Sequence, residues 1–590
     1  MENREIAKIF HDIADLLDIK GGNPFRSRSY RNAAHIIEGL AISLKSIVET
    51  DEKKLEDIPG IGKSMHEKIV ELVRTGRCAA REELLKELPS GLLDILSISG
   101  VGHKKAEILY KELGIKDVGG LEEAARAGRL RGLSGMGEKS EAKLIKAIES
   151  YKRLKHGGMR HKIPSARRYA EDYLRYMKEA PEVIRLEAAG SLRRWKETIG
   201  DIDILATCLR RRPAAREKSG TAAIIERFVN YPDVASVIAE GGTKASVVLR
   251  NGLQADLRVV EEKSFGAALQ YFTGSKAHNV ALRERAGLRG LKLSEYGVFD
   301  KTGHYVAGKT EEDVYKALGL EWIPPELREN SGEIEAAEKG RLPKLVELKD
   351  IKGDLHVHTI DSDGNAAMID VAEAAMKTGY AYVAVTDHSK AVGIARGMDD
   401  ERLLEQLRRV DRLNERLEKQ GRYFRVLKGA EVDIKSDGAL DYKDETLRKL
   451  DIAVGAVHSK FDMTRDDMTN RLLKAISSGL IHVLAHPTGR LVGTREPYDF
   501  DMEKVMIAAS KRFVALELNA FPDRLDLSDS HCRLAKKIGV MVAISTDSHS
   551  VMNLDYMTYG VHTARRGWLE KKDVLNCMTL KKLMGFLKRR

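Results

Sequence analysis

Apolar residues follow three different patterns along this chain of 590 residues. In the first 150 residues they belong to helical stretches that follow Gly-containing turns, and around 201–207 they form a β-prone run. After residue 380, short runs that are apolar at nearly every position alternate with helical stretches such as 400–419. Strands that are apolar on both faces and separated by helices predict a parallel α/β barrel, whose active site lies at the C-terminal strand ends.

The length of the chain predicts about three to five domains. The charged stretch 326–350 lacks strand character, which predicts a short helix and a linker. The longest run without Asp, Glu, Lys or Arg, 475–489, is shorter than the roughly 18 residues of a membrane span. The charged N-terminus is unlike a signal peptide, so we expect a cytoplasmic protein that does not enter a membrane.

Charge and cysteine content narrow the class of partner and metal site. The net charge of +11 and the pI near 9.1 permit binding to a polyanion without requiring it. Basic residues are dense in 151–170, which holds seven Lys and Arg and no acidic residue. The four cysteines are scattered without CxxC spacing, so any metal is expected on His and carboxylate ligands: Cys78, Cys208, Cys532 and Cys577.

A motif of apolar, small, Gly, apolar and Gly residues occurs three times before residue 150, each time ahead of a helical stretch. Its glycines allow a tight turn, and the N-terminus of the following helix presents free N–H groups to a phosphate. A single copy would indicate a helix-to-helix connector as readily as a phosphate-binding turn. Three copies, each with a Lys or His within two residues of the second Gly, favour contact with a DNA backbone. The glycines are Gly60, Gly62, Gly100, Gly102, Gly135 and Gly137.

These three segments resemble the helix-hairpin-helix motifs of DNA repair proteins, and the first resembles the lyase domain of DNA polymerase beta. The resemblance implies that Lys68 is a Schiff-base lysine that removes a 5′ deoxyribose phosphate, with Tyr30 beside the 5′ phosphate. Ser64 replaces a second lysine of that family pattern. The alternative, that Lys68 only faces solvent or a phosphate, stays open.

Asp201 and Asp203 are separated by one residue inside the β-prone run, so on a strand both carboxylates project from the same face. Like charges this close are costly unless a divalent cation neutralises them, and Mg²⁺ or Mn²⁺ held by carboxylates suits phosphoryl transfer. Residues 245–260 predict a hairpin that turns at Asn251 and Gly252. Asp256 on its return strand is the candidate third ligand.

The order of Gly190, Ser191, the Asp pair and a later Asp resembles the nucleotidyltransferase signature of family X DNA polymerases. In that family the Gly-Ser pair and the arginine at the position of Arg194 bind the triphosphate. Segment 271–299 resembles the thumb region of DNA polymerase beta. This resemblance implies template-directed DNA synthesis with dNTPs.

The same resemblance implies roles for further side chains, although Lys276 stands where polymerase beta has an acid, which leaves one nucleotide contact open. The implied positions are the nascent base pair for Tyr271, Phe272 and Gly274, the minor groove for Asn279, the template strand for Arg283, and DNA for Arg258.

Nearly every apolar run of the C-terminal part ends in a His, Asp or Glu. One such residue is more typical of a core or surface position at which the side chain is simply hydrogen-bonded. Nine at equivalent positions predict a cluster of up to three metal ions. They are His356, His358, Asp363, His388, Glu431, His458, His486, Asp547 and His549. His482, His531 and His562 lack that placement, and we expect them to be structural.

The motifs DLHVHT, SDG, TDHS, GAE, VHS, AHP and TDSH resemble the polymerase and histidinol phosphatase (PHP) domain family. Imidazole and carboxylate ligands suit Mn²⁺, Zn²⁺ or Fe²⁺, which activate water and clamp a phosphate. Asp387, beside His388, is expected to orient the metal ligands from outside the cluster. A PHP domain after a family X polymerase is the arrangement of the bacterial and archaeal PolX enzymes, whose PHP site is a 3′-5′ exonuclease with abasic-site endonuclease and 3′-end trimming activities.

Together the resemblances imply a monomeric DNA repair enzyme that fills short gaps in gapped or nicked DNA. The expected domains are a helical lyase-like domain at 1–85, fingers with two helix-hairpin-helix motifs at 86–150, an α/β palm at 151–260, a small α+β thumb at 261–325, the linker at 326–350 and an α/β PHP barrel at 351–590. Two alternatives stay open: a small-molecule phosphatase tethered to DNA, and a DNA-end scaffold with structural metals.

Overall fold

The computed structural model describes residues 3–21, 23–38, 44–56, 58, 60–96, 98, 100–133, 136–137, 140–141, 144–145, 147–148, 160–208 and 220–589. The chain forms two compact units, Met1–Gly158 and Met159–Arg590. No helix in the described part of the chain is both long and apolar enough to cross a membrane.

The first unit is built from helices around one apolar core, to which Phe10, Leu72 and Leu109 contribute fully buried side chains. Asp51 and Asp117 start two of the helical segments by accepting a backbone N–H. Its elements are α1 (Asn3–Lys20), α2 (Pro24–Glu38), α3 (Leu44–Asp51), η1 (Glu52–Leu55), α4 (Lys63–Thr75), α5 (Ala79–Glu87), α6 (Gly91–Leu96), α7 (His103–Leu113) and α8 (Val118–Arg126).

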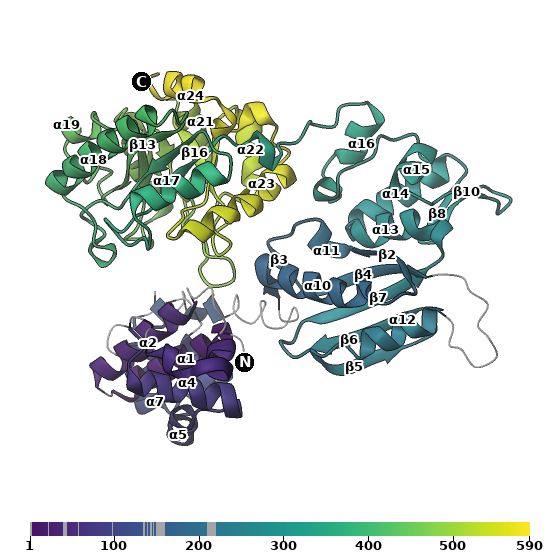
Figure 1. The fold of residues 1–590 in the computed structure, drawn as a ribbon, viewed down its shortest axis with the longest axis horizontal. Coiled ribbons are helices and arrows are strands. Elements are labelled where there is room, and N and C mark those ends of the chain that lie inside the picture. The colour runs from purple at the N-terminus through teal and green to yellow at the C-terminus, as the bar shows by residue number, and fades with distance from the viewer. Residues whose placement is uncertain are drawn as a thin grey trace. The chain divides into compact units, whose positions relative to one another are not determined.

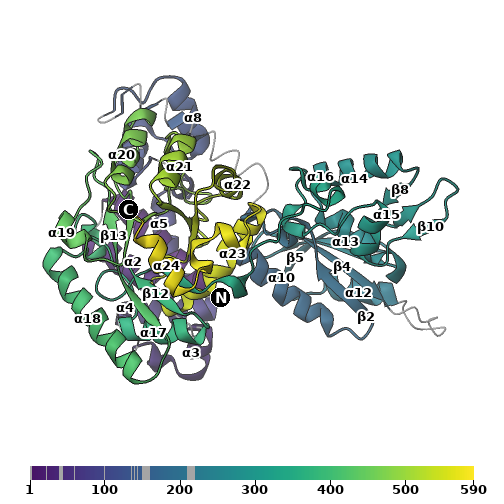
Figure 2. The same cartoon turned by 90° about the horizontal axis from the view of Figure 1, so that it is seen from above.

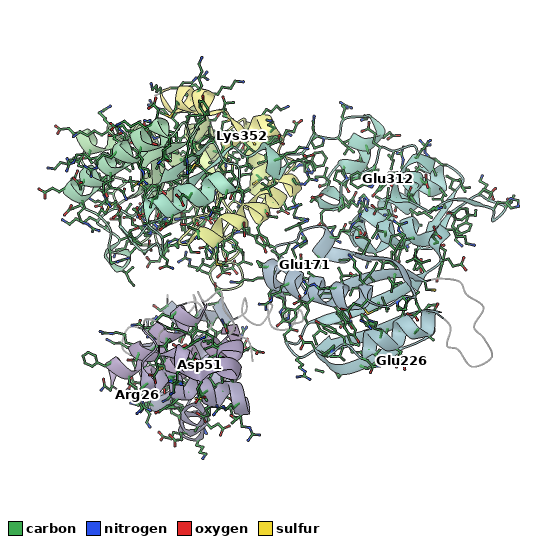
Figure 3. The ribbon with its side chains drawn as sticks, in the orientation of Figure 1. Arg26, Asp51, Glu171, Glu226, Glu312 and Lys352 are labelled. Atoms are coloured by element: carbon green, nitrogen blue, oxygen red, sulfur yellow. The ribbon has the colours of Figure 1, made fainter. Side chains whose placement is uncertain are left out.

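The second unit begins with a five-stranded sheet in the order β2-β4-β7-β6-β5 (Figure 1). Helices α10 and α12 pack together on one face of it, where the Tyr173 and Phe228 rings stack 4.8 Å apart. Their outer sides carry exposed Glu171 and Glu226, labelled in Figure 3. The elements are β1 (His161–Lys162), α10 (Ile163–Lys178), β2 (Val183–Ala188), α11 (Gly190–Arg193), β3 (Thr198–Ile199), β4 (Asp201–Cys208), α12 (Gly220–Val229), β5 (Val234–Glu240), β6 (Lys244–Leu249) and β7 (Gln254–Val260).

The next segment packs helices against the three-stranded sheet β10-β9-β8. Buried Glu311 forms ion pairs with Arg193 and with fully buried Arg328, whereas Glu312, labelled in Figure 3, is exposed. The expected linker contains the short helix α16 and buries Ile334 and Val346. The elements are η2 (Glu262–Ser264), α13 (Phe265–Thr273), α14 (Lys276–Leu288), β8 (Lys292–Ser294), β9 (Gly297–Phe299), β10 (Tyr305–Ala307), α15 (Glu311–Ala317), η3 (Pro325–Leu327), α16 (Glu333–Glu338) and η4 (Leu348–Asp350).

The C-terminal part is a parallel barrel of seven strands in sequence order. A bridge between Val357 and Ser548 brings its first and last strands together, and helices lie outside the strands (Figure 2). The elements are β11 (Gly353–Val357), α17 (Met368–Lys377), β12 (Tyr382–Val385), η5 (Gly393–Ala395), α18 (Asp400–Lys419), β13 (Arg425–Asp433), α19 (Asp444–Leu447), β14 (Ile452–Ala456), α20 (Arg465–Ser477), β15 (Val483–Leu484), α21 (Met502–Lys511), β16 (Ala515–Asn519), α22 (Asp529–Ile538), β17 (Val542–Ser545), η6 (Val551–Tyr556), α23 (Met557–Arg566), η7 (Lys571–Asp573), η8 (Leu575–Cys577) and α24 (Leu580–Leu587).

The barrel strands are buried on both sides, as their uniform apolar sequence predicts. Inward-facing Leu355, Leu427 and Val483 share a core with Leu583 and Leu587 of α24. The helical N-terminal part, the palm-like sheet and the barrel confirm the fold class expected from the sequence.

Candidate active sites

The first candidate site lies on two neighbouring parallel strands of the palm-like sheet. Asp203 on β4 is paired in register with Asp256 on β7, and Asp201 precedes Asp203 on the same face. One carboxylate oxygen from each of the three residues lies within 4.8 Å of the others. The hairpin expected at Gly252 is present, with the backbone N–H of Gly252 donating to Leu249 O at 2.8 Å.

The three carboxylates repel one another at this site. Burial, then the charges of Asp201 and Asp256, raise the pKa of Asp203 to about 7. Burial and the charge of Asp256 also raise the pKa of Asp201. Since a divalent cation would relieve this repulsion, and since Mg²⁺ prefers carboxylate oxygens, the three residues fit a metal.

Surrounding side chains hold these carboxylates in place. Asp256 accepts hydrogen bonds from the Ser246 hydroxyl and, at 2.9 Å, from the Gln254 amide. Gly190 has a left-handed φ of +63°, and a Cβ atom built there would lie 2.1 Å from Asp203 Oδ2. Only glycine therefore lets helix α11 begin this close to the carboxylate.

A cavity of about 230 Å³ lies beside the carboxylates and is lined by Asp203, Asp256, Arg258 and Phe272 among others. The Arg258 guanidinium lies 5.5 Å from the centre of the Phe272 ring. Tyr271 and Phe272, at the end of α13, meet edge to face with ring centroids 5.2 Å apart.

Two of the expected nucleotide-binding residues are engaged in internal hydrogen bonds. Buried Asn279 donates to Tyr271 O at 2.6 Å and to Gly274 O at 3.2 Å, which fixes the turn after α13. Arg194 donates from Nε to Glu329 at 3.0 Å and from Nη1 to Thr273 O at 2.6 Å. Ser191 lies on α11, and Arg283 is exposed on α14.

The second candidate site lies at the C-terminal ends of the barrel strands. The nine residues expected from the sequence come together there, in three overlapping groups joined by shared side chains. The groups are His358, Asp363, His388 and His549; His356, His358 and Asp547; and His388, Glu431 and His458, while His486 Nε2 lies 2.9 Å from Glu431 Oε1.

Carboxylates outside the nine orient two of the histidines. Nδ1 of His356 lies 2.7 Å from Glu517 Oε1, and Nδ1 of His458 lies 3.1 Å from Asp433 Oδ1. These contacts direct the Nε2 atoms of both rings toward the centre. Sequence reasoning missed Glu517, although a glutamate inside the apolar run FVALELNAF is a signal that could have found it.

Asp387 contacts the segment between two of the clustered residues, His358 and Asp363. It accepts hydrogen bonds from Thr359, from Ser362 at 2.5 Å and from Gln406 at 2.6 Å. Asp387 therefore fixes the loop that carries Asp363.

The spacing and the unsatisfied atoms of the cluster fit metal ions. Two ligands about 2.1 Å from one ion are separated by about 3 Å, and His358 Nε2 lies 3.1 Å from Asp547 Oδ1. Nδ1 of buried His388 and Oε2 of buried Glu431 have no hydrogen-bond partner in the described part of the chain, yet lie 2.8 Å apart. Burial opposes ionisation of Glu431, but the charges of His388 and His458 outweigh it and hold its pKa well below the usual value.

One backbone hydrogen bond recurs in the three glycine-containing turns. Ile61, Val101 and Met136 donate their N–H groups to Ile58 O, Ile98 O and Leu133 O at 3.0, 3.1 and 3.1 Å. Gly60 and Gly100 have left-handed φ values of +91° and +86°, while Gly62 and Gly102 precede helices α4 and α7. Gly137 is described, but Gly135 lies outside the described residues.

Lys68 and Tyr30 meet in the first unit. Nζ of Lys68 lies 5.9 Å from the centre of the Tyr30 ring and donates to Ser64 Oγ at 3.0 Å. Tyr30 is buried and packs edge to face against Phe10. Ser64, the departure from the lyase pattern, thus contacts the lysine directly.

The whole chain is 39% identical to the DNA polymerase/3′-5′ exonuclease PolX of Bacillus subtilis (strain 168), over 100% of both proteins. The chain belongs to the PolX family. Family models place a helix-hairpin-helix domain at 1–78, a SAM-like helix-hairpin-helix tandem at 92–150, the DNA polymerase beta thumb at 268–329 and a PHP domain at 354–519.

Two further relatives each match one part of the chain. DNA polymerase lambda of Rattus norvegicus is 26% identical over 52% of this chain and 53% of its own. A probable phosphatase of Thermoanaerobacter sp. (strain X514) is 28% identical over 38% of this chain and 89% of its own.

Proposed function

We propose that this PolX protein fills short gaps in DNA with dNTPs and trims 3′ ends at a separate site in its PHP barrel. One observation carries the proposal: a single chain holds both a carboxylate triad on β4 and β7 and a His-rich cluster at the ends of the barrel strands. Nucleotidyl transfer and phosphodiester hydrolysis are both reactions that such centres catalyse when they hold metal ions. Full-length similarity to a DNA polymerase/3′-5′ exonuclease supports the pairing of the two.

In the polymerase site we assign Asp201, Asp203 and Asp256 to hold Mg²⁺ or Mn²⁺. Such ions neutralise charge on the transferring phosphoryl group and lower the pKa of a primer hydroxyl. We assign Asp256, whose carboxylate accepts hydrogen bonds from Ser246 and Gln254, to help activate the primer 3′-OH.

The nucleotide and DNA contacts are assigned to side chains around this triad. Gly190, Ser191 and Arg194 bind the triphosphate, and Tyr271, Phe272 and Gly274 form the wall beside the incoming sugar. Asn279 supports that wall by holding the Tyr271 and Gly274 carbonyls. Arg258 and Arg283 contact DNA.

In the PHP site the nine clustered residues are assigned to hold up to three ions of Mn²⁺, Zn²⁺ or Fe²⁺. These metals activate water and polarise a phosphodiester when bound. Glu517 and Asp433 keep the Nε2 atoms of His356 and His458 turned inward, so the protein prepares the site before substrate arrives. The same site would process abasic sites and blocked 3′ ends.

The helical N-terminal unit is assigned to DNA binding through the glycine-containing turns, with Lys68 as the lyase nucleophile beside Tyr30. We propose the domain bounds stated above, and a monomer that acts in the cytoplasm on gapped or nicked duplexes.

Similarity of the barrel to probable phosphatases favours a second candidate, a small-molecule phosphatase attached to a DNA-binding half. Two parallel assays of the wild-type protein with Mn²⁺ distinguish these functions. One uses an end-labelled duplex with a one-nucleotide gap, and the other uses histidinol phosphate. We expect gap filling and 3′ shortening of the duplex. Rapid hydrolysis of histidinol phosphate with an intact DNA 3′ end would replace the exonuclease assignment by the phosphatase.

A further inference from the structure

Helix α23 of the PHP barrel contacts the loop that carries Arg194. The backbone oxygen of Arg194 accepts a hydrogen bond from Arg566 Nη1 at 2.8 Å, although the two residues are far apart in the chain. The same Nη1 donates to Glu329 Oε1 at 3.1 Å, and Glu329 Oε1 in turn accepts from Arg194 Nε at 3.0 Å. One guanidinium thus fixes both the main chain and the counter-ion of Arg194.

Arg566 is itself rigidly placed at the end of α23. Its Nε and Nη2 donate to Asp529 Oδ2 at 3.0 and 2.6 Å, and its side chain is 4% exposed. A buried, fully engaged guanidinium keeps its geometry because any other rotamer would leave charges unpaired. Burial opposes ionisation of Glu329, but Arg194 and Arg566 outweigh it and lower its pKa, so the carboxylate stays charged at neutral pH.

A second contact from the same face of α23 holds the next residue of the loop. His562, one turn before Arg566, stacks on Trp195 with ring centroids 3.5 Å apart and planes 5° apart. Trp195 has a φ of 56°, a left-handed conformation that a bulky residue adopts at a cost. The stack, with Arg167 4.0 Å from the Trp195 ring, offsets that cost.

Arg194 has one guanidinium nitrogen left for a ligand. Nε and Nη1 are used by Glu329 and Thr273, and no hydrogen bond from Nη2 occurs within the described residues. Helix α11 begins at Gly190, beside Asp203, and ends directly before Arg194. Nη2 is therefore the guanidinium nitrogen that stays available to a triphosphate in the proposed role of Arg194.

We propose that Arg566 of the PHP barrel is a positioning residue for DNA synthesis: through Glu329 and the backbone of Arg194 it holds the arginine that binds the dNTP triphosphate. The inference rests on the proposed role of Arg194. It makes the barrel part of the polymerase nucleotide site, independently of its own metal cluster.

The experiment measures KM for dNTP and kcat on a one-nucleotide gap, with 3′-5′ exonuclease rate as a test of barrel integrity. Loss of an interaction that only binds the triphosphate raises KM and leaves kcat unchanged, so Arg566→Ala should raise KM about tenfold, with kcat within about twofold. Exonuclease activity should be unchanged. Arg566→Lys keeps the positive charge but not the several donors of the planar guanidinium, so its KM should lie between those of wild type and Arg566→Ala.

Arg565→Ala is the matched control. Arg565 is the preceding arginine of α23 and bonds Glu326 at 2.7 Å, but it does not contact Arg194. We expect the KM of Arg565→Ala for dNTP to stay near the wild-type value. If KM rises equally in Arg565→Ala and Arg566→Ala, the cause is a general disturbance of the interface, and the proposal is overturned.

Two further variants distinguish an error in the proposed role of Arg194 from an error in the proposed role of Arg566. Arg194→Ala must itself raise KM; if it does not, the proposed role of Arg194 is wrong. If Arg194→Ala raises KM while Arg566→Ala and Glu329→Gln both leave it within about twofold, Arg194 binds the nucleotide but the link through the barrel is wrong. Glu329→Gln probes the same link should Arg566→Ala fail to fold, and in the Arg194→Ala background Arg566→Ala should add little.

Discussion

Asp203 on β4 and Asp256 on β7 are directly paired across two parallel strands, so their carboxylates face each other from neighbouring backbones. This pairing makes the position of both acids a property of the sheet, not of a loop. Rigid placement suits a site that must hold cations at fixed spacing for phosphoryl transfer.

Gly190 leaves the space that Asp203 needs. We expect Gly190→Ala to reduce DNA synthesis at least a hundredfold, because the added Cβ would overlap Asp203 Oδ2 and the left-handed φ would be strained. Steady-state gap filling measures this. Gly242→Ala, where a Cβ would meet nothing within 4 Å, is the control and should behave as wild type. Near-normal synthesis by Gly190→Ala would show that the carboxylate geometry is not required.

Glu517 orients a histidine of the PHP site. In Glu517→Gln the charged partner of His356 is lost, and we expect metal affinity to fall about 10- to 100-fold. Exonuclease activity should fall at low Mn²⁺ and return at high Mn²⁺, while gap filling stays constant. Titrating exonuclease rate against Mn²⁺ measures the shift. An unchanged Mn²⁺ dependence would mean that Glu517 has no influence on the metals.

Buried Glu311 stabilises the thumb-like segment through Arg328 and Arg193. These arginines outweigh burial and lower the pKa of Glu311 from its usual 4.5 to about 2. Since the folded pKa is lower than the unfolded one, this stabilisation is fully present above pH 5 and is lost as pH falls toward 2. Glu311→Gln should therefore destabilise the segment by about 3 kcal/mol at pH 7.

Hydrogen exchange of α15 and its neighbours at pH 7 and pH 3 measures that difference. The gap between wild type and Glu311→Gln should narrow at the lower pH. A constant gap would show that the carboxylate charge does not stabilise the segment.

Lys68 is accessible beside Tyr30 and Ser64. If it is the lyase nucleophile, borohydride should trap wild-type protein covalently on DNA with a 5′ deoxyribose phosphate, and Lys68→Ala should abolish the adduct. Lys63→Ala, at the exposed start of α4, is the matched control and should still be trapped. Persistent trapping of Lys68→Ala would assign the amine elsewhere.

The two metal-capable sites could be located from the sequence because each is encoded by position along strands. The spacing of Asp201 and Asp203 puts both on one strand face, and the turn at Gly252 returns Asp256 to the same edge. In the barrel, equivalent strand ends meet at one rim, so ligands at those ends had to converge.

Features that depend on tertiary packing could not be predicted. The hydrogen bonds of the Asn279 amide with the backbone of the turn after α13 are one example. The hydrogen bond from Arg566 to Arg194 joins residues that share no local sequence pattern. Glu517 resembles an ordinary strand residue in the sequence, and only the folded barrel brings it to His356. Hydrogen-bond partners distant in sequence leave no periodic signal.

The central claim is that one chain carries two independent active sites. The most direct test follows an end-labelled primer in a one-nucleotide gap with Mn²⁺, with and without dNTPs, for wild type, Asp203→Ala and His358→Ala. We expect Asp203→Ala to shorten the primer without extending it and His358→Ala to extend it without shortening it. If wild type extends the primer but neither it nor Asp203→Ala ever shortens it, the barrel cluster does not act on DNA 3′ ends and the account is contradicted.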